Sequence, residues 1–244
     1  MAKFHLTRTI RRLIRNAGVR HFLRRQAPSP LSSSEQRLLD RFHDFYYRRW
    51  QTGGETLTSY WLGQRAEKCP LDLWVYQEII FEQKPDFIIE AGTRFGGSAK
   101  FLASICDLVG NGKVISIDID PNALRPEHPR ITYAEGSSTA ETTVARVRSL
   151  VGDAKKCLVI LDSDHARDHV RREMELYGTF VSVGGYMIVE DTNVNGFPTY
   201  PNHGPGPMEA VRNYFLTHDE FVIDRSRERF LLTLNPCGYL RRVK

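Results

Sequence analysis

The stretch Asp86-Phe-Ile-Ile-Glu-Ala-Gly-Thr-Arg-Phe-Gly-Gly-Ser98 decides the fold. An apolar run with the character of a buried strand leads into Glu90, glycines follow, and a run with helical spacing opens at Ser98. The stretch therefore predicts a strand, a tight glycine turn and a helix. Glycine at such a turn tolerates positive φ and lets backbone N–H groups approach a ligand, while the helix presents its positive end. A nucleotide-like ligand fits there.

The three glycines, Gly92, Gly96 and Gly97, are spaced Gly-x-x-x-Gly-Gly. This spacing differs from the Gly-x-Gly-x-x-Gly of a dinucleotide fold, and the lysine of a phosphate loop does not follow. The order of acid and glycines is similar to that of class I S-adenosylmethionine-dependent methyltransferases, in which the carboxylate ends the first strand near the amino acid end of the cofactor. A βα turn without a ligand is the alternative.

The chain beyond residue 86 alternates between strand and helix patterns. Strands are predicted at 87–90, 114–118, 131–134, 157–161 and 186–190, with helices at 98–108, 139–151 and 167–182. A long loop at 192–208, a helix near 208–216 and two strands near 220–224 and 230–234 complete the chain. We predict an α/β, Rossmann-like fold: a mostly parallel seven-stranded sheet with helices on both faces and a C-terminal antiparallel hairpin turning at 225–229. Ligands bind at the carboxyl ends of the strands in such folds.

The domain organisation follows from this pattern. Residues 35–244 form one predicted domain, with a helical lead-in at 35–85 and the sheet core at 86–244. Ser34 is the expected cap of the first lead-in helix, and 57–62 and 71–81 are expected as further helices. Because the lead-in is rich in aromatic residues, it favours core packing or a homo-oligomer.

Residues 1–34 form a basic arm and linker, with eight Lys or Arg residues and no acid. The other 210 residues carry 26 basic and 29 acidic side chains, so the body is mildly acidic. The arm predicts either a cationic amphipathic helix that contacts an anionic membrane surface or acidic partner, or a solvated arm packed on a neighbouring subunit. An acidic body disfavours nucleic acid as a partner.

The lack of a recognisable targeting signal and the spacing of the cysteines lead us to expect a cytoplasmic protein. No apolar run approaches the length of a transmembrane helix, and the arm lacks the apolar core of a secretory signal. The four cysteines are far apart and form no CxxC pair. We expect Cys106 and Cys157 to be reduced core residues of an intracellular protein, with membrane association through the arm left open.

Acidic residues follow several predicted strands. Asp118 ends the second strand, where an acid commonly accepts hydrogen bonds from both ribose hydroxyls of an adenosine, whereas Asp120 is suited to starting a turn. Glu135-Gly-Ser-Ser138 follows the third strand, and is suited to contacting an adenine edge or to capping a helix. Asp162 and Glu190-Asp191 follow the fourth and fifth strands, which puts carboxylate oxygens on one rim. Such oxygens suit Mg²⁺ or a similar divalent cation.

Four motifs, read in order, resemble those of the cephalosporin hydroxylase family. They are Glu90-Ala-Gly-Thr-Arg-Phe-Gly-Gly-Ser98, Ser116-Ile-Asp-Ile-Asp120, Leu161-Asp-Ser-Asp-His165 and Gly185-Tyr-Met-Ile-Val-Glu-Asp191. Characterised members of that family include S-adenosylmethionine- and Mg²⁺-dependent O-methyltransferases of antibiotic and rhamnosyl hydroxyls. The resemblance covers roughly residues 86–200, and the motif order is also similar to that of catechol-type O-methyltransferases.

The resemblance implies roles for individual residues. The metal-binding acids of the family correspond to Asp162, Glu190 and Asp191. Its cofactor contacts correspond to Glu90, Gly92, Ser98, Asp118 and Ser138, and we include Thr93, Gly97 and Asp162 as cofactor-binding candidates. Where catechol-type enzymes have a catalytic lysine, this chain has His165, which favours a histidine base. His169 and His203 are the alternative bases, and a backbone-bonded histidine is the structural alternative for His165.

The implied activity is methyl transfer from S-adenosylmethionine to a hydroxyl of a sugar or glycosylated metabolite, assisted by a divalent cation. An aliphatic hydroxyl is a weak nucleophile, so it needs a metal, a base, or both. Two other functions compete: an NAD(P)-dependent oxidoreductase on the same type of fold, and a protein that binds or modifies nucleic acid through the basic arm. The methyltransferase accounts for the glycine turn, Asp118 and both acid clusters together.

Overall fold

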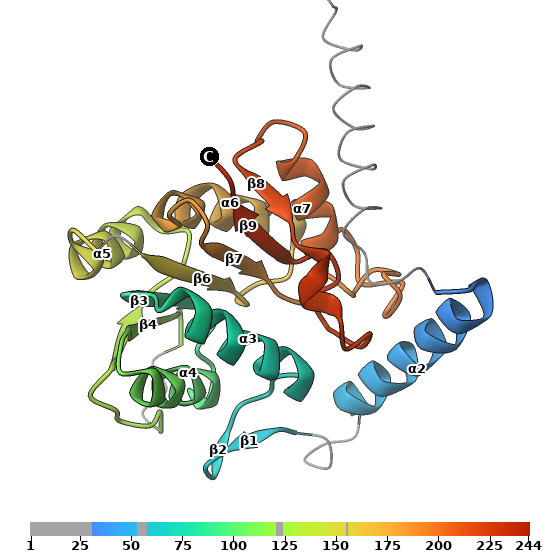
Figure 1. The fold of residues 1–244 in the computed structure, drawn as a ribbon, viewed down its shortest axis with the longest axis horizontal. Coiled ribbons are helices and arrows are strands. Elements are labelled where there is room, and N and C mark those ends of the chain that lie inside the picture. Colours follow the sequence, from blue (N-terminus) through green and yellow to red (C-terminus); the bar gives the residue numbers. More distant parts are fainter. Residues whose placement is uncertain (1–30, 53–57, 121–123, 155) are drawn as a thin grey trace, which may run out of the picture.

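A seven-stranded sheet forms the centre of the fold (Figure 1). The computed structural model describes residues 31–52, 58–120, 124–154 and 156–244. The strands lie in the order β5-β4-β3-β6-β7-β9-β8. Their bounds are Phe87–Ala91 (β3), Lys113–Asp118 (β4), Ile131–Glu135 (β5), Cys157–Leu161 (β6), Tyr186–Val189 (β7), Phe221–Ile223 (β8) and Tyr239–Arg242 (β9).

Strands β3 to β7 run parallel, so their carboxyl ends share one edge. β3 lies inside the sheet, and Ile89 pairs with Ile115 of β4 on one side and with Val159 of β6 on the other. β9 pairs antiparallel with both β7 and β8. The predicted α/β class, with a mostly parallel seven-stranded sheet and an antiparallel C-terminal pair, is confirmed.

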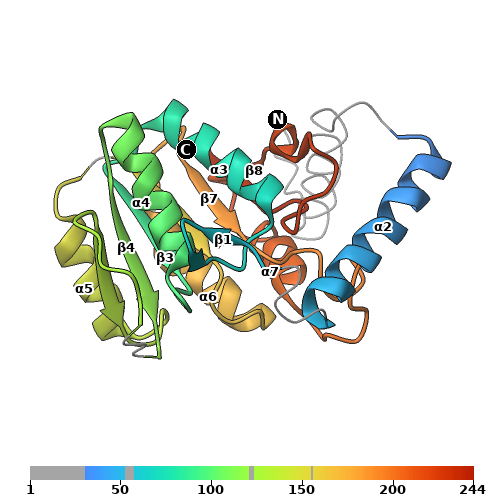
Figure 2. The same cartoon turned by 90° about the horizontal axis from the view of Figure 1, so that it is seen from below.

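Helices cover both faces of the sheet (Figure 2). Because side chains alternate along a strand, Ile88 and Ile89 point to opposite faces, and both are fully buried. Ile88 packs with α3 and α4, whereas Ile89 packs in the core that α5, α6 and α7 cover. The bounds are Pro70–Gln83 (α3), Gly97–Val109 (α4), Glu141–Val151 (α5), Arg167–Tyr177 (α6) and Pro207–Tyr214 (α7). The two apolar cores hold the strand ends in place.

The C-terminal hairpin differs from the prediction in its second strand. The segment 225–229 turns as a 3₁₀ helix, Arg225–Glu228, but residues 230–234 form a loop, and the pairing strand is β9. The carboxylate of Asp72 on α3 accepts hydrogen bonds from the backbone N–H of Leu234 (2.9 Å) and from the hydroxyl groups of Thr233 and Tyr239. These buried bonds attach the loop to α3 and satisfy its polar groups outside a ladder.

The lead-in differs from the prediction at two places. The first helix, α2 (Ser33–Thr52), begins earlier than expected, and Ser32 rather than Ser34 forms the reciprocal cap with Glu35: the Glu35 carboxylate accepts from the Ser32 N–H (2.7 Å), and the Ser32 hydroxyl accepts from the Glu35 N–H (3.3 Å). In the described part of 57–62, a short antiparallel pair replaces the expected helix: β1 (Tyr60–Trp61) with β2 (Gln64–Arg65).

Helix α2 stands at one end of the molecule, beside the segment that follows β7 (Figure 2). The side chains of His43 and Asn193 join the two across 3.1 Å. Cys106 and Cys157 are buried and free, as predicted. None of the described helices is long and apolar enough to cross a bilayer. Residues 1–30 lie outside the described part of the chain, so the prediction of a basic arm at 1–34 falls almost entirely outside it.

Candidate active site

A cavity of about 410 Å³ opens at the carboxyl edge of the parallel strands. The turn after β3, the ends of β4, β6 and β7, and one face of α2 line it. The predicted site residues that line it are Gly92, Thr93, Ser98, Asp118, Ser138, Asp162, His165, Glu190 and Asp191. Glu90 and Gly97 lie behind this lining. The predicted residues that line the cavity, from Gly92 to Asp191, come from the turns and strand ends that the parallel sheet carries to one edge.

Asp118 occupies the end of β4 at one end of the cavity. Its carboxylate accepts hydrogen bonds from the backbone N–H groups of Arg94 (2.7 Å) and Asp120 (2.8 Å), and Arg125 lies 3.5 Å away. Each carboxylate oxygen has a second lone pair, so Asp118 can still accept from a ligand hydroxyl. The Asp120 side chain does not line the cavity, which agrees with its expected role in the turn.

The glycine turn brings β3, β4 and β6 close together. Gly92 has a φ of +98° and donates its N–H to the carbonyl of Ile117 (2.8 Å), and an added Cβ would lie 1.9 Å from the backbone oxygen of Asp162. Only glycine fits this position. An added Cβ at Gly97 would lie 2.0 Å from the backbone oxygen of Arg65, so its small size serves packing against β2.

Glu90 is fully buried beneath the cavity. It accepts a hydrogen bond from the Ser116 hydroxyl (2.6 Å), which itself lies 2.6 Å from the hydroxyl of Thr93. Burial raises the pKa of Glu90, while the charge of Lys68 and the hydroxyl of Ser116 act in the opposite direction. Glu90 therefore places a buried, hydrogen-bonded carboxyl group beneath the cavity, near Lys68 and Asp162.

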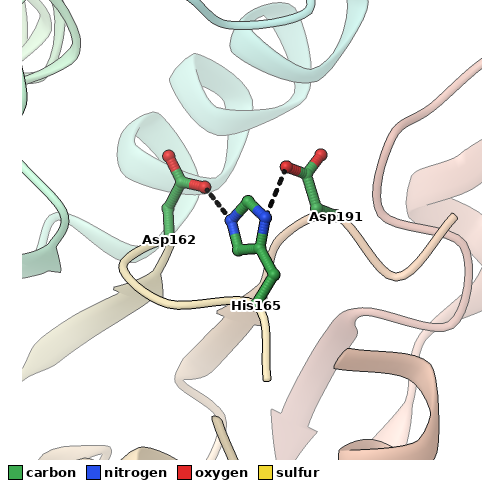
Figure 3. A group of neighbouring side chains, drawn as sticks. All are labelled: Asp162, His165 and Asp191. Carbon is green, nitrogen blue, oxygen red and sulfur yellow. Dashed lines mark hydrogen bonds and ion pairs between the residues drawn. The ribbon is translucent and has the colours of Figure 1, made fainter. Parts of the chain in front are cut away.

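The strand-end acids meet at the opposite end of the cavity from Asp118. The backbone N–H of Asp162 donates to Ala91 (2.8 Å), and that of Glu190 donates to Leu161 (3.0 Å), so the sheet ladder continues one residue past each strand and sets the acids side by side. The ring of His165 lies between two of them (Figure 3). Its Nε2 is 3.3 Å from Asp162 Oδ1, and its Nδ1 is 3.4 Å from Asp191 Oδ2.

Asp162, His165 and Asp191 have the geometry of a metal-binding group, because one ligand atom from each lies within 4.8 Å of the others. Burial alone would lower the pKa of His165, but the charges of Asp191 and Asp162 raise it to about 9. A divalent cation bound between the two carboxylates would balance the negative charges that now stabilise protonated His165. The structure thus brings together two of the three predicted metal acids with the predicted base.

The third predicted metal acid, Glu190, faces Lys68, a residue that sequence reasoning missed. The ammonium of Lys68 donates to Glu190 Oε1 (2.7 Å) and to Asp162 Oδ2, and the residue is only 4% exposed. Burial, with the charge of Asp162, raises the pKa of Glu190 to about 8, although Lys68 opposes this shift. The charges of Lys68 and His165 lower the pKa of Asp162 despite its burial.

Asp191 has a left-handed backbone, with a φ of +51°. Its N–H donates to Asn235 Oδ1 (3.1 Å), and the Asn235 amide donates to the hydroxyl of Tyr76 (2.8 Å). Asn235 and Tyr76 are almost fully buried. The C-terminal loop and α3 therefore brace the backbone that presents Asp191, a role that no local pattern in the sequence indicates.

The two alternative histidines have different surroundings. His169 Nε2 lies 3.0 Å from the Ser138 hydroxyl and 3.6 Å from Glu173, and these contacts hold its ring beside Ser138. His203 packs near His165, with ring centroids 6.5 Å apart. His165 alone of the three lies between the two acids (Figure 3).

The sheet order, the glycine turn and the strand-end acids define the class I O-methyltransferase fold. The family described as Rhamnosyl O-methyltransferase/CmcI matches residues 55–243. The chain belongs to this family, and the predicted resemblance and O-methyltransferase class are confirmed.

Individual relatives agree with the family match. The Rhamnosyl O-methyltransferase of Mycobacterium tuberculosis (strain ATCC 25618 / H37Rv) is 38% identical over 215 residues, which cover 83% of this chain and 84% of that protein. The Rhamnosyl O-methyltransferase of Mycobacterium leprae (strain TN) is 38% identical over 211 residues, covering 84% of this chain and 90% of that protein. A solved structure of cmcI with Mg and SAM shares the fold at a TM-score of 0.61 and 23% identity, covering 81% and 84% of the two chains.

Proposed function

We propose that the protein transfers the methyl group of S-adenosylmethionine to a hydroxyl of a rhamnosyl or similar sugar residue, with a divalent cation such as Mg²⁺ at the acidic end of the cavity. The observation that carries the proposal is the meeting of the glycine turn, Asp118 and the acids Asp162 and Asp191 in one cavity. Family membership decides in favour of the methyltransferase over the nicotinamide-dependent and nucleic-acid alternatives.

The residues present fit the cofactor. Asp118 and Ser138 both line the cavity. The Asp118 carboxylate would accept from the ribose hydroxyls, and the Ser138 hydroxyl would contact the edge of the adenine. Gly92 lines the cavity, and its lack of a side chain lets the turn approach the backbone of Asp162. The carboxylates of Glu90 and Asp162 suit the positively charged amino and sulfonium groups of the cofactor. The cavity volume of about 410 Å³ suits a ligand of this size.

The residues also fit a hard divalent cation. Asp162 and Asp191 offer carboxylate oxygens within 4.8 Å of each other, and His165 lies between them. A bound cation would stabilise the negative charge that develops on the acceptor oxygen. Glu190 remains a proposed ligand, although in this structure its carboxylate is bonded to Lys68.

The proposed reaction is a displacement at the methyl carbon, in which the protein supplies the base. The acceptor oxygen attacks the methyl carbon in line with the sulfur, the carbon–sulfur bond breaks, and its electron pair stays on the sulfur of S-adenosylhomocysteine. His165 receives the hydroxyl proton at a ring nitrogen. Asp162, His165 and Asp191 would hold the cation, whose positive charge would favour the neutral form of the His165 ring as the base.

The choice of acceptor rests on the relatives. The two mycobacterial proteins, each 38% identical to this chain, are named Rhamnosyl O-methyltransferase. We therefore propose a rhamnosyl hydroxyl as the acceptor in this chain too. A cytoplasmic location, a homo-oligomer and membrane contact through the basic arm remain predictions from the sequence.

Calorimetric titration tests the cofactor and metal assignments. S-Adenosylmethionine and S-adenosylhomocysteine are titrated into wild type, Asp118→Ala and Asp191→Ala, with Mg²⁺ and with chelator. We expect Asp118→Ala to weaken cofactor binding by about tenfold or more, because it removes a charged hydrogen-bond acceptor. We expect Asp191→Ala to weaken mainly Mg²⁺ binding.

Asp120→Ala is the matched control, since Asp120 follows the same strand but its side chain does not line the cavity. It should bind both ligands like wild type, because the bond to Asp118 uses only its backbone. Failure of wild type to bind either ligand under any condition would overturn the proposed function.

A further inference from the structure

One face of α2 lines the cavity through Tyr47, Trp50 and Gln51. Their spacing of three and four positions places them on the same side of the helix. None of the three belongs to the sheet or the glycine turn, and the sequence pattern alone favours reading such aromatic residues as core or subunit interface. The cavity thus has a wall that the methyltransferase core does not supply.

This wall stands at the acidic end of the cavity. Tyr47 packs in an apolar cluster with Val194 and Leu234, and Leu234 also lines the cavity. Burial raises the pKa of Tyr47, and the negative charge of nearby Asp191 adds to this shift. The wall therefore faces the proposed reaction centre rather than the end with Asp118.

Neighbouring contacts hold the wall in position. The rings of Trp50 and Tyr46 lie 5.9 Å apart, which supports the indole from the next turn of the helix. His43 joins the helix to Asn193, two residues after Asp191. These contacts fix the position of the wall relative to the segment that carries Asp191.

The chemistry of the wall matches a neutral sugar ring. The wall residues Tyr47, Trp50 and Gln51 carry no charge at neutral pH. Trp50 is half-buried, and it offers more of its ring than Tyr47, which is only 4% exposed. The Gln51 amide donates to the Tyr47 hydroxyl (3.1 Å), and within the described part of the chain this leaves the amide oxygen and the tyrosine proton for a ligand. A pyranose presents one face of C–H bonds and a rim of hydroxyls, so it needs an apolar surface beside a few polar groups.

We propose that α2 recognises the acceptor: Trp50 and Tyr47 contact the C–H face of a neutral pyranose, and Gln51 bonds to a ring hydroxyl that does not react. This inference rests on the proposed sugar acceptor and assigns the residues that select it. Trp50 and Gln51 are specificity residues, and the cofactor end of the cavity functions without them.

Saturation-transfer NMR with methyl α-L-rhamnopyranoside tests the assignment on full-length protein saturated with S-adenosylhomocysteine and Mg²⁺. We expect transfer to the ring protons in wild type and an affinity about tenfold weaker in Trp50→Ala. Trp50→Phe should restore most of the affinity, because it keeps an aromatic face. In methyl-transfer assays, Trp50→Ala should raise KM for the rhamnoside while kcat stays within about threefold.

Trp74→Ala is the matched control, because Trp74 lies on α3, is 60% exposed and does not line the cavity. It should bind the rhamnoside like wild type. Calorimetry of S-adenosylhomocysteine should give wild-type affinity in every variant, which shows that the fold is intact. Unchanged rhamnoside affinity in Trp50→Ala would overturn the role of α2 while leaving the proposed function standing. A wild type that binds the cofactor but neither binds nor methylates the rhamnoside would instead overturn the sugar acceptor itself, and this inference with it.

Discussion

The buried ammonium of Lys68 predicts a large loss of stability in Lys68→Met. The Lys68 side chain is 5% exposed, and the carboxylates that it contacts, Asp162 and Glu190, are 20% and 8% exposed. Methionine fills a similar volume but removes the buried cation that both carboxyl groups contact, and among the described residues it leaves only His165 as a positive partner of Asp162. Removing one partner from a buried ion pair typically costs about 3–5 kcal/mol, so we expect a loss of that size at pH 7 in the absence of metal.

Urea unfolding in the presence of chelator measures this effect as a lower midpoint at an unchanged m-value. Lys100→Met is the control, because the Lys100 ammonium donates to an exposed backbone carbonyl, that of Leu62 (3.1 Å), and its loss should be below about 1 kcal/mol. Added Mg²⁺ should restore part of the stability of Lys68→Met, since a cation at the acids replaces the missing charge. A loss in Lys68→Met no larger than that of Lys100→Met would refute the reasoning.

Two further predictions concern protonation at the same centre. The pKa of Glu190 is raised to about 8 and that of His165 to about 9, so both groups contribute stability at low pH that is lost as pH rises through these values. Thermal melting in chelator should therefore show Tm falling between about pH 6.5 and pH 9, which lies above the range in which His43, whose pKa burial lowers to about 4, acts in the opposite direction. A flat or rising Tm over that range would contradict the prediction. For catalysis, His165→Ala should lower kcat by about 10²-fold to 10⁴-fold, whereas His169→Ala should change it by less than tenfold. Single-turnover methyl transfer at saturating cofactor measures both variants, and equal losses would remove the assignment of His165 as the base.

Local patterns were sufficient for the elements that carry strong periodicity. The strands β3, β4, β5, β6 and β7 lie within a residue or two of their predicted positions. The inner strands are largely apolar runs bounded by turns, and the edge strand β5 has the alternating pattern of a half-buried strand. The strand expected at 230–234 shows where this signal fails. Phe230-Leu-Leu-Thr-Leu234 has strand-like composition, yet its backbone bonds to buried Asp72 on α3 instead of to a neighbouring strand. β-Propensity reports suitability for a half-buried surface, and tertiary partners decide whether a ladder forms.

Lys68 and α2 show what the sequence pattern does not contain. Lys68 is separated from Asp162 by 94 residues and from Glu190 by 122 residues, and its neighbours in the sequence give no hint of a buried cation. Tyr47, Trp50 and Gln51 have the helical spacing of an ordinary packing face, and only their place beside Asp191 makes them candidates for acceptor recognition.

The sequence by itself determined the order of strands and helices from β3 to β8, the glycine turn and the acids at the strand ends. These depend on the local spacing of apolar, glycine and acidic residues, and the parallel sheet carries each strand end to the same edge. The tertiary structure alone decided which side chains neutralise those acids and which helix closes the cavity. Charge pairing and cavity walls depend on distances between segments far apart in the chain, because electrostatic and packing energies act through space and not along the sequence.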